Sequence, residues 1–285
     1  MNSAAQKDNV TLIGSETYKS YIKSPYRSVK HSTYFETYDA LLAPYRGKAI
    51  TFVEIGIFDG GSLFMWRDYF GPNARIIGIE LNPEAKKWED HGFEIFTGSQ
   101  SDETFWQKFF AEIGPVDILL DDGGHTYEQQ IITTECALPH IKDGGLLVVE
   151  DTHTSYMRGF GPRRYSFMAY VKKRLDKINR RYGRFAKRGG AETRIWSVQV
   201  FESITAFHIN RAASERISTP TENNNNAPQA VDFRHFDNAL YQRAAAKSFA
   251  KKDGKKALGS GKIARRFWKL VTRLKGASRT RTFFK

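Results

Sequence analysis

The alternation of short apolar runs with helix-like segments between residues 50 and 151 constrains this chain more than any other feature. The segments at 61–70, 83–90, 102–110 and 126–141 have helical spacing or propensity. The runs between them are apolar on both faces, as strands buried between two helical layers must be. In chain order these runs read AITFVEIG, RIIGIEL, FEIFTG, VDILLDD and GLLVVED. Strands that alternate with helices over short connections predict a doubly wound, mostly parallel α/β sheet.

The rest of the chain divides by composition. Residues 32–47 are typical of an amphipathic helix, and two more β-rich runs lie at 193–209. Beyond them the sequence becomes polar and turn-rich, and then low in apolar residues and high in charge, which favours disorder with local helices. We therefore expect an N-terminal extension at 1–29, one domain at 30–211, a linker at 212–230 and a basic tail at 231–285.

The net charge of +13 is concentrated in two segments. Residues 211–285 hold 18 Lys and Arg against 5 Asp and Glu, whereas residues 1–210 hold 26 of each sign. Within that neutral body, residues 163–188 carry 11 basic side chains against Asp176 as the sole acid. A protein that grips nucleic acid would carry basic residues across the whole domain, so the charge pattern disfavours a nucleic-acid partner.

Cysteine content and the first residues indicate the compartment. The chain has one cysteine, Cys136, which excludes a disulfide framework and a multi-cysteine metal site. The stretch MNSAAQKDNV has no apolar core of signal-peptide length, and no run reaches the roughly 18 apolar residues of a membrane-spanning helix. We expect a cytoplasmic protein.

A glycine-rich loop follows the first apolar run. In VEIGIFDGGS, Gly56 and Gly60 let the backbone turn tightly and bring amides close to a bound group. The next run ends in Glu80, where nucleotide-binding α/β folds place an acid that binds ribose hydroxyls. Together they indicate an adenosine-containing ligand, although the spacing differs from the G-x-G-x-x-G of nicotinamide-binding folds. Taken alone, the glycines could merely make the turn and Glu80 could cap Asn82–Pro83.

Carboxylates end two runs that we expect to be neighbours in the sheet. The fourth run ends in Asp121 and Asp122, with His125 three residues further on. The fifth run ends in Glu150 and Asp151. Neighbouring parallel strands lie about 4.8 Å apart, so these acids converge and repel one another unless protons or a cation neutralise them. A hard divalent ion with oxygen ligands, Mg²⁺ above all, suits such a cluster. Either pair alone could simply cap a helix or end a strand.

Taken together, the motifs resemble those of class I S-adenosylmethionine-dependent methyltransferases. Glu54, Gly56 and Gly60 fit the E-x-G-x-x-x-G loop of that family. The spacing of Asp122 and His125, with an acid pair 25 residues after the histidine, is similar to that of the metal-dependent macrolide sugar O-methyltransferases and their cephalosporin hydroxylase-like relatives. The likeness covers most of the expected domain and excludes the tail.

The resemblance implies a Rossmann-like sheet of seven strands whose final pair forms an antiparallel hairpin. It also implies that S-adenosylmethionine and Mg²⁺ are the cofactors, and that His125 is the general base that takes a proton from an alcohol. The implied cofactor-binding residues are Glu54, Gly56, Gly60, Glu80, Ser99, Gln100 and, at the methionyl end, Asp121. The implied Mg²⁺ ligands are Asp122, Glu150 and Asp151.

By the same resemblance the acceptor is a sugar or glycan hydroxyl, and residues of about 156–188 take the place of a substrate lid. Aromatic side chains there could stack on a pyranose, and arginines could pair with phosphate or carboxylate. The alternative is a solvated basic helix. Two other functions stay open: an RNA-directed methyltransferase, and a noncatalytic membrane-associated protein that retains the fold.

The tail contains a candidate amphipathic helix at about 262–275. Apolar residues fall on one arc at 100° per residue and basic residues on another, which is the pattern of an interfacial helix that binds anionic lipid. This predicts a peripheral enzyme at the inner membrane face, where a lipid-linked glycan would be the substrate. A partner-binding helix and a nonspecific RNA-binding tail are the alternatives, and a homo-oligomer is left open.

Overall fold

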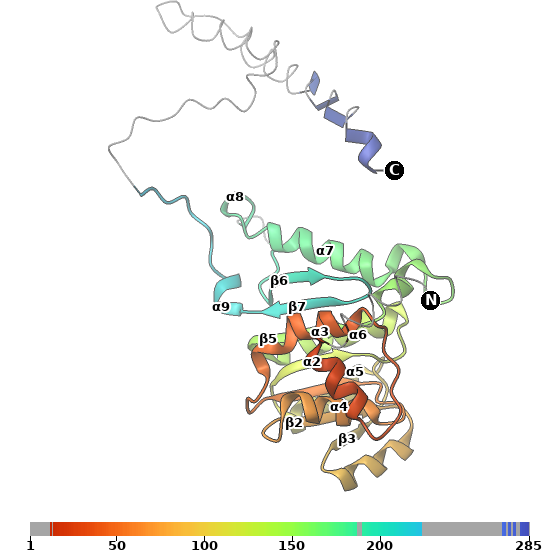
Figure 1. Cartoon of the computed structure of the whole chain (residues 1–285). Coiled ribbons are helices and arrows are strands. Elements are labelled where there is room, and N and C mark those ends of the chain that lie inside the picture. The colour runs from red at the N-terminus through yellow and green to blue at the C-terminus, as the bar shows by residue number, and fades with distance from the viewer. Residues whose placement is uncertain are drawn as a thin grey trace, which may run out of the picture. The chain divides into compact units, whose positions relative to one another are not determined.

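The computed structural model describes residues 14–186 and 190–223 without a break, together with Leu12 and scattered positions between 270 and 284. By its contacts the chain forms two compact units, Met1–Pro220 and Thr221–Lys285. The first unit holds the α/β domain (Figure 1). Within the second unit, a 3₁₀ helix, η6, spans Arg281–Phe284.

A seven-stranded sheet in the order β3-β2-β1-β4-β5-β7-β6 forms the centre of the domain. Strands β1 to β5 run parallel to one another, and β7 runs antiparallel to both β5 and β6. The predicted doubly wound sheet with an antiparallel final hairpin is therefore confirmed. The strands are β1 Thr51–Ile55, β2 Arg75–Glu80, β3 Glu94–Thr97, β4 Val116–Asp121, β5 Ile141–Val149, β6 Ile195–Val200 and β7 Thr205–Ile209.

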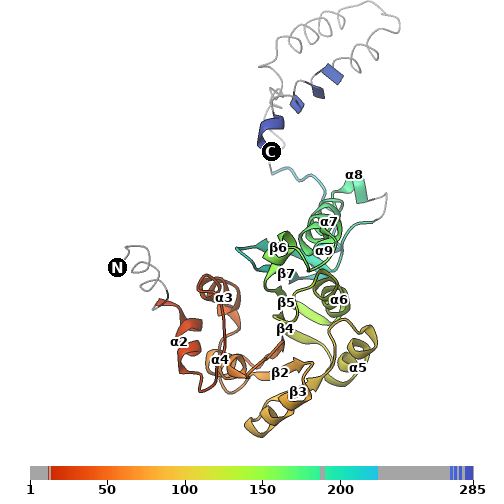
Figure 2. The ribbon, with the colours of Figure 1, turned by 90° about the vertical axis from the view of Figure 1, so that its right-hand side faces the viewer.

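Helices cover both faces of this sheet (Figure 2). The α-helices are α2 Glu16–Lys23, α3 Tyr34–Leu42, α4 Gly61–Phe70, α5 Glu103–Ile113, α6 Tyr127–Ala137, α7 Phe167–Asn179, α8 Gly183–Ala186 and α9 Arg211–Ser214. Short 3₁₀ helices lie between them: η1 Ala43–Tyr45, η2 Pro83–His91, η3 Leu138–His140, η4 Thr152–Tyr156 and η5 Arg163–Tyr165.

Two apolar cores result, because alternate residues of each strand point to opposite faces. Phe52 of β1 belongs to the core under α3 and α4, where Trp66 is fully buried. Its neighbour Val53 belongs to the core under α5, α6 and α7, where Trp106 is buried. Strands that bury both faces explain why the runs in the sequence are continuously apolar.

The predicted helical segments differ from the structure in two places. In the segment predicted at 126–141, α6 ends at Ala137, residues 138–140 form the 3₁₀ helix η3, and Ile141 begins β5. Residues 61–70 form α4 with the expected bounds, and a capping box on Thr126 and Gln129 starts α6. Residues 83–91, in contrast, form the 3₁₀ helix η2, which starts at Pro83 after Asn82 caps the amide of Glu84. Tighter 3₁₀ turns are common in short connections between strands, and sequence patterns do not separate them from α-helix.

Helix α2 lies within residues that we predicted to precede the domain. The carboxylate of Asp39 in α3 accepts hydrogen bonds from the amides of Glu16 and Thr17, at 2.9 and 3.0 Å. Ser20 donates to Asp68 of α4 at 2.7 Å. These contacts attach α2 to the core, and the extended segment after it leads into the carboxyl edge of the sheet.

The predicted lid at 156–188 contains two different parts. Residues 157–166 form an irregular stretch with η5, whereas α7 buries Phe167 and Val171 completely in the core beneath α6 and the hairpin. Basic side chains of α7 such as Lys172 and Lys173 lie on its exposed face. The helical part of the segment is thus a layer of the fold.

The predicted amphipathic helix at 262–275 falls mostly outside the described residues, and so does the linker beyond residue 223. In the part of the chain that the structure describes, no helix has both the length and the hydropathy to cross a bilayer. The membrane role of the tail stays a prediction.

Candidate active site

The candidate site lies at the carboxyl edge of the parallel strands, where β1, β2, β4 and β5 end together. Asp121 pairs with Ile55 of β1 and with Val149 of β5, so the next residues of β4 and β5, Asp122 and Glu150, leave the sheet side by side. The amide of Glu150 still donates to the carbonyl of Asp121 at 2.9 Å. The register of three neighbouring strands therefore brings the two acid pairs together.

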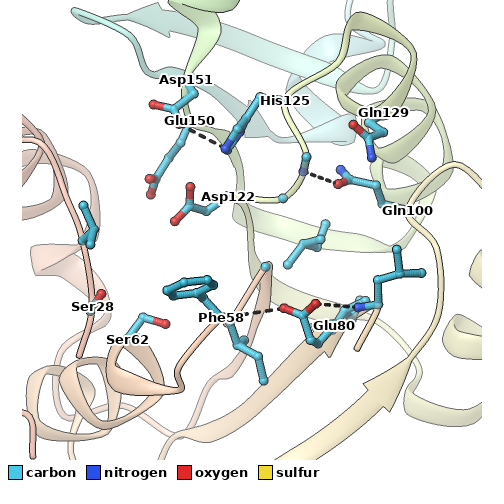
Figure 3. Close-up of a pocket in the computed structure, with 18 of the residues that line it drawn as sticks. Ser28, Phe58, Ser62, Glu80, Gln100, Asp122, His125, Gln129, Glu150 and Asp151 are labelled. Atoms are coloured by element: carbon cyan, nitrogen blue, oxygen red, sulfur yellow. Dashed lines mark hydrogen bonds and ion pairs between the residues drawn. The ribbon is translucent and has the colours of Figure 1, made fainter. Parts of the chain in front are cut away.

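A pocket of about 630 Å³ opens at this edge. Figure 3 shows Glu80, Gln100 and Gln129 around one side of the pocket. Gathered on the other side are Asp122, His125, Glu150 and Asp151. Its walls come from the glycine loop, the ends of β2, β3, β4 and β5, and the segment between α2 and α3. The volume is in the range typical of small-molecule sites.

Gly56 and Gly60 shape the loop because a side chain at either position would collide with a neighbour. Gly56 has φ +82°, and a Cβ there would lie 2.1 Å from the carbonyl oxygen of Asp122. Gly60 has φ +78°, and a Cβ there would lie 2.3 Å from the indole of Trp88. Gly56 thereby lets β1 and the Asp122 loop approach closely beneath the pocket.

Glu80 joins the end of β2 to the glycine loop. One carboxylate oxygen accepts hydrogen bonds from the amides of Leu81 and Asn82 at 2.8 and 3.1 Å, and the other accepts from the amide of Phe58 at 3.2 Å. Both oxygens face the pocket wall (Figure 3). The oxygen that accepts from Phe58 keeps a lone pair that a hydroxyl donor from a ligand could use.

Ser99 and Gln100 line the pocket after β3. Gln100 is buried and fastens the Asp122 loop: its carbonyl accepts from the amide of Gly124 at 2.8 Å, and its amide donates to Asp121 at 2.9 Å. The pocket wall at the end of β4 is formed by residues 122–124, while Asp121 lies behind it. Burial raises the pKa of Asp121 to about 6.

Glu54 supports the site from beneath the loop. It is fully buried and accepts hydrogen bonds from Ser62 at 2.6 Å and from the indole of Trp66 at 3.1 Å. Burial raises the pKa of its carboxyl. Ser62 in turn lines the pocket, so Glu54 fixes the first turn of α4 against β1.

Asp122, His125 and Asp151 form the exposed half of the acid cluster. One ligand atom from each lies within 4.8 Å of the others, and the imidazole Nε2 of His125 is 3.2 Å from Asp151 Oδ2. The hydroxyl of Tyr34 donates to the other oxygen of Asp151. His125 and Asp151 both have positive φ, 58° and 53°. Non-glycine residues in this conformation cluster at functional sites.

Glu150 faces a different partner, the ammonium group of Lys30. Lys30 Nζ lies 2.6 Å from Asp122, 3.2 Å from Glu150 and 3.6 Å from Glu54, and its side chain is 2% exposed. Tyr38 donates to Glu150 at 2.6 Å. Burial alone would lower the pKa of Lys30, but the surrounding carboxylates hold that pKa well above its ordinary value.

The structure thus divides the three predicted metal ligands. Among the described residues, the group whose atoms could meet on one ion contains Asp122 and Asp151 with His125, and it does not contain Glu150. The carboxylates of Asp122 and Asp151 supply the oxygens that Mg²⁺ prefers. The donor set of the exposed half fits the ion.

Sequence reasoning missed Lys30, Tyr34 and Tyr38. Their spacing of four residues places them on one side of the approach to α3 and of the helix itself. The sequence feature that could have revealed them is the presence of two tyrosines and a lysine on the otherwise apolar face of an amphipathic segment. Polar groups that become buried need polar partners. The acids across the sheet supply those partners.

A second, smaller pocket of about 420 Å³ lies between α6 and the irregular part of the predicted lid. Ile131 and Ile132 of α6 line it, together with Phe160 and Tyr165. The amide of Tyr127 donates to the carbonyl of Phe160 at 2.9 Å, which holds the loop against the start of α6. Since His125 lies two residues before α6, this pocket is close in sequence to the predicted base.

Comparison with known proteins finds similarity to methyltransferases. Residues 53–152 match the family model described as a methyltransferase domain. The solved structure of the MycE methyltransferase from the mycinamycin biosynthetic pathway, in complex with Mg and SAH, resembles the chain with a TM-score of 0.63 at 25% identity. The likeness covers 73% of this chain and 55% of that one. Residues 53–152 thus resemble a methyltransferase domain, and the described fold resembles that of a methyltransferase solved with Mg and SAH.

The curated proteins that match part of this chain are named as O-methyltransferases. The 8-demethyl-8-alpha-L-rhamnosyl tetracenomycin-C 2'-O-methyltransferase of Streptomyces olivaceus is 35% identical over 135 residues, which is 45% of this chain and 35% of that protein. The mycinamicin VI 2''-O-methyltransferase of Micromonospora griseorubida is 32% identical over 131 residues, 44% of this chain and 32% of that protein. The matched part thus spans about a third of each relative.

Proposed function

We propose that this chain transfers a methyl group from S-adenosylmethionine to a sugar or glycan hydroxyl, with Mg²⁺ as a second cofactor. The observation that carries the proposal is the arrangement of Asp122, His125 and Asp151 at the rim of a pocket whose other side holds Glu80 and the glycine loop. An adenosine-sized ligand on the Glu80 side would place its reactive end toward His125. The names of the relatives support a sugar as acceptor.

His125 is the general base in this mechanism. With a proton on Nε2 donated to Asp151, 3.2 Å away, the ring turns the lone pair of Nδ1 toward an acceptor hydroxyl. The proton moves from that hydroxyl to Nδ1, a C–O bond forms, and the bond from the methyl carbon to sulfur breaks. The products are a methyl ether and S-adenosylhomocysteine.

Asp122 and Asp151 would hold the Mg²⁺ ion. When bound, it lowers the pKa of a coordinated hydroxyl, which makes the proton easier to remove. Asp151 has a second role, because it also accepts from Tyr34 and orients His125. Asp151 has a left-handed backbone conformation, and its carboxylate contacts His125, which follows β4, and Tyr34 of α3.

Isothermal titration calorimetry with S-adenosylmethionine, followed by a methyl-transfer assay on a panel of rhamnosides and other glycosides with and without Mg²⁺, tests the function. We expect micromolar cofactor binding and Mg²⁺-dependent formation of methyl ethers. Binding that is absent in the folded protein would reject the assignment. Transfer that continues without Mg²⁺, and in both Asp122→Ala and His125→Ala, would reject the mechanism.

Replacing Glu80 with glutamine should weaken S-adenosylmethionine binding by about ten- to a hundredfold. The substitution removes a charged acceptor of hydrogen bonds, each of which is worth roughly 1.5–3 kcal/mol. Calorimetry measures the change in Kd. Glu84→Gln, at an exposed position of η2, is the matched control and should leave Kd unchanged. Equal cofactor affinity in Glu80→Gln and wild type would contradict the assigned role.

A further inference from the structure

Lys30 brings a positive charge into the acid cluster from a segment that sequence reasoning placed at the border of the domain. The segment of residues 24–33 runs in extended and bent form between α2 and α3. Its Lys30 side chain is inserted between the ends of β1, β4 and β5, where Asp122, Glu150 and Glu54 surround the ammonium group. A buried ammonium with three carboxylate neighbours is a cation site that the chain fills itself.

Asp122 belongs to both halves of the cluster. Its Oδ2 atom lies 2.6 Å from Lys30 Nζ, and it is also one of the three residues whose ligand atoms converge at the rim. A divalent ion bound to Asp122 would therefore lie within a few ångströms of an ammonium group. Like charges at that distance repel strongly in a site shielded from water. Contact of either cation with Asp122 therefore weakens the binding of the other.

We propose that Lys30 is a resident cation that competes with the divalent metal for Asp122. In the metal-free protein its ammonium neutralises Asp122 and Glu150 and keeps the two strand ends together. Metal binding at Asp122 and Asp151 displaces the ammonium from Asp122, and Glu150 with Tyr38 retains it. The inference rests on the proposed function only for the presence of a divalent ion, and it concerns binding rather than methyl transfer.

The competition also links metal binding to the conformation of the segment of residues 24–33, which forms part of the pocket wall. Arg27, Ser28, Val29 and His31 of the same segment line the pocket together with Lys30. We infer that a lysine that moves from Asp122 toward Glu150 also loosens the backbone on either side of it. The segment therefore becomes more accessible when the metal is bound, at the place where an acceptor would enter.

Binding of Mn²⁺ to the full chain, followed by the electron paramagnetic resonance signal of the free ion, tests the competition without any substrate. Lys30→Gln removes the competing charge and should bind Mn²⁺ at least tenfold more tightly than wild type. Lys142→Gln is the matched control, since Lys142 is exposed and pairs with Asp117 near the start of β4, at the other end of that strand from Asp122. It should change the Kd less than twofold.

An unchanged or weaker affinity in Lys30→Gln, or absence of Mn²⁺ binding in both proteins, would overturn the proposal. Should Lys30→Gln fail to fold, trypsin digestion of the wild type decides: cleavage after Arg27 and Lys30 should become at least several times faster with saturating Mn²⁺. An equal rate with and without the ion would overturn the proposal too. Loss of methyl transfer with these results intact would reject the proposed function alone.

Discussion

Replacing His125 with alanine is expected to lower the rate of methyl transfer by about 10²–10⁴-fold, the usual contribution of a general base. The imidazole lines the pocket and can accept a hydroxyl proton on one nitrogen while Asp151 holds the other, 3.2 Å away. The loss should fall on kcat, because the ring is assigned to the proton and not to the cofactor. Single-turnover transfer of a labelled methyl group measures it.

The affinity for S-adenosylmethionine should stay within a factor of about three in His125→Ala, which separates a chemical role from a collapsed site. His140→Ala is a suitable control, since His140 stacks on Phe110 with ring centroids 4.1 Å apart, in the connection that leads into β5 rather than at the site. That variant should keep full activity. A rate within tenfold of wild type in His125→Ala would remove His125 from the mechanism.

Replacing Gly56 with alanine is expected to destabilise the fold by about 3 kcal/mol or more. The residue adopts φ +82°, which costs an L side chain on the order of 1–3 kcal/mol. The new Cβ would also lie 2.1 Å from the carbonyl oxygen of Asp122, so the two loops must separate. Urea denaturation followed by circular dichroism gives the change in the free energy of unfolding.

Gly92→Ala isolates the collision from the backbone cost. Gly92 has nearly the same φ, +79°, and a Cβ there would meet nothing within 4 Å. It should lose only about 1 kcal/mol. The loss in the free energy of unfolding that Gly56→Ala shows beyond that of Gly92→Ala therefore measures the cost of the collision between residue 56 and the Asp122 loop. Equal losses in the two variants would show that this contact tolerates a methyl group.

The sheet could be predicted because its signal is local and repeated. Each buried strand is a short, mostly apolar run, and the connections between the strands are short. The 3₁₀ form of η2 escaped prediction because its propensities are those of an α-helix. The packing of α2 on the domain was not predicted for another reason. It depends on contacts with Asp39 and Asp68, which are far away in sequence.

The site was predictable in the part that strand register determines. Asp122, Glu150 and Asp151 follow two adjacent strands, so their convergence is a consequence of the sheet order. Which donor each carboxylate binds depends on side chains that arrive from elsewhere. Lys30 lies outside any strand, and its ammonium contacts Glu150 from the segment that precedes α3.

The distance along the chain between Lys30 and Glu150, 120 residues, has a consequence for synthesis. At roughly 5–20 residues per second, a ribosome needs on the order of ten seconds to proceed from one to the other. Throughout that interval the lysine has no acid of β5 to meet. A nascent chain that ends before β5 therefore cannot form the contact between Lys30 and Glu150, whichever helices have already formed outside the exit tunnel.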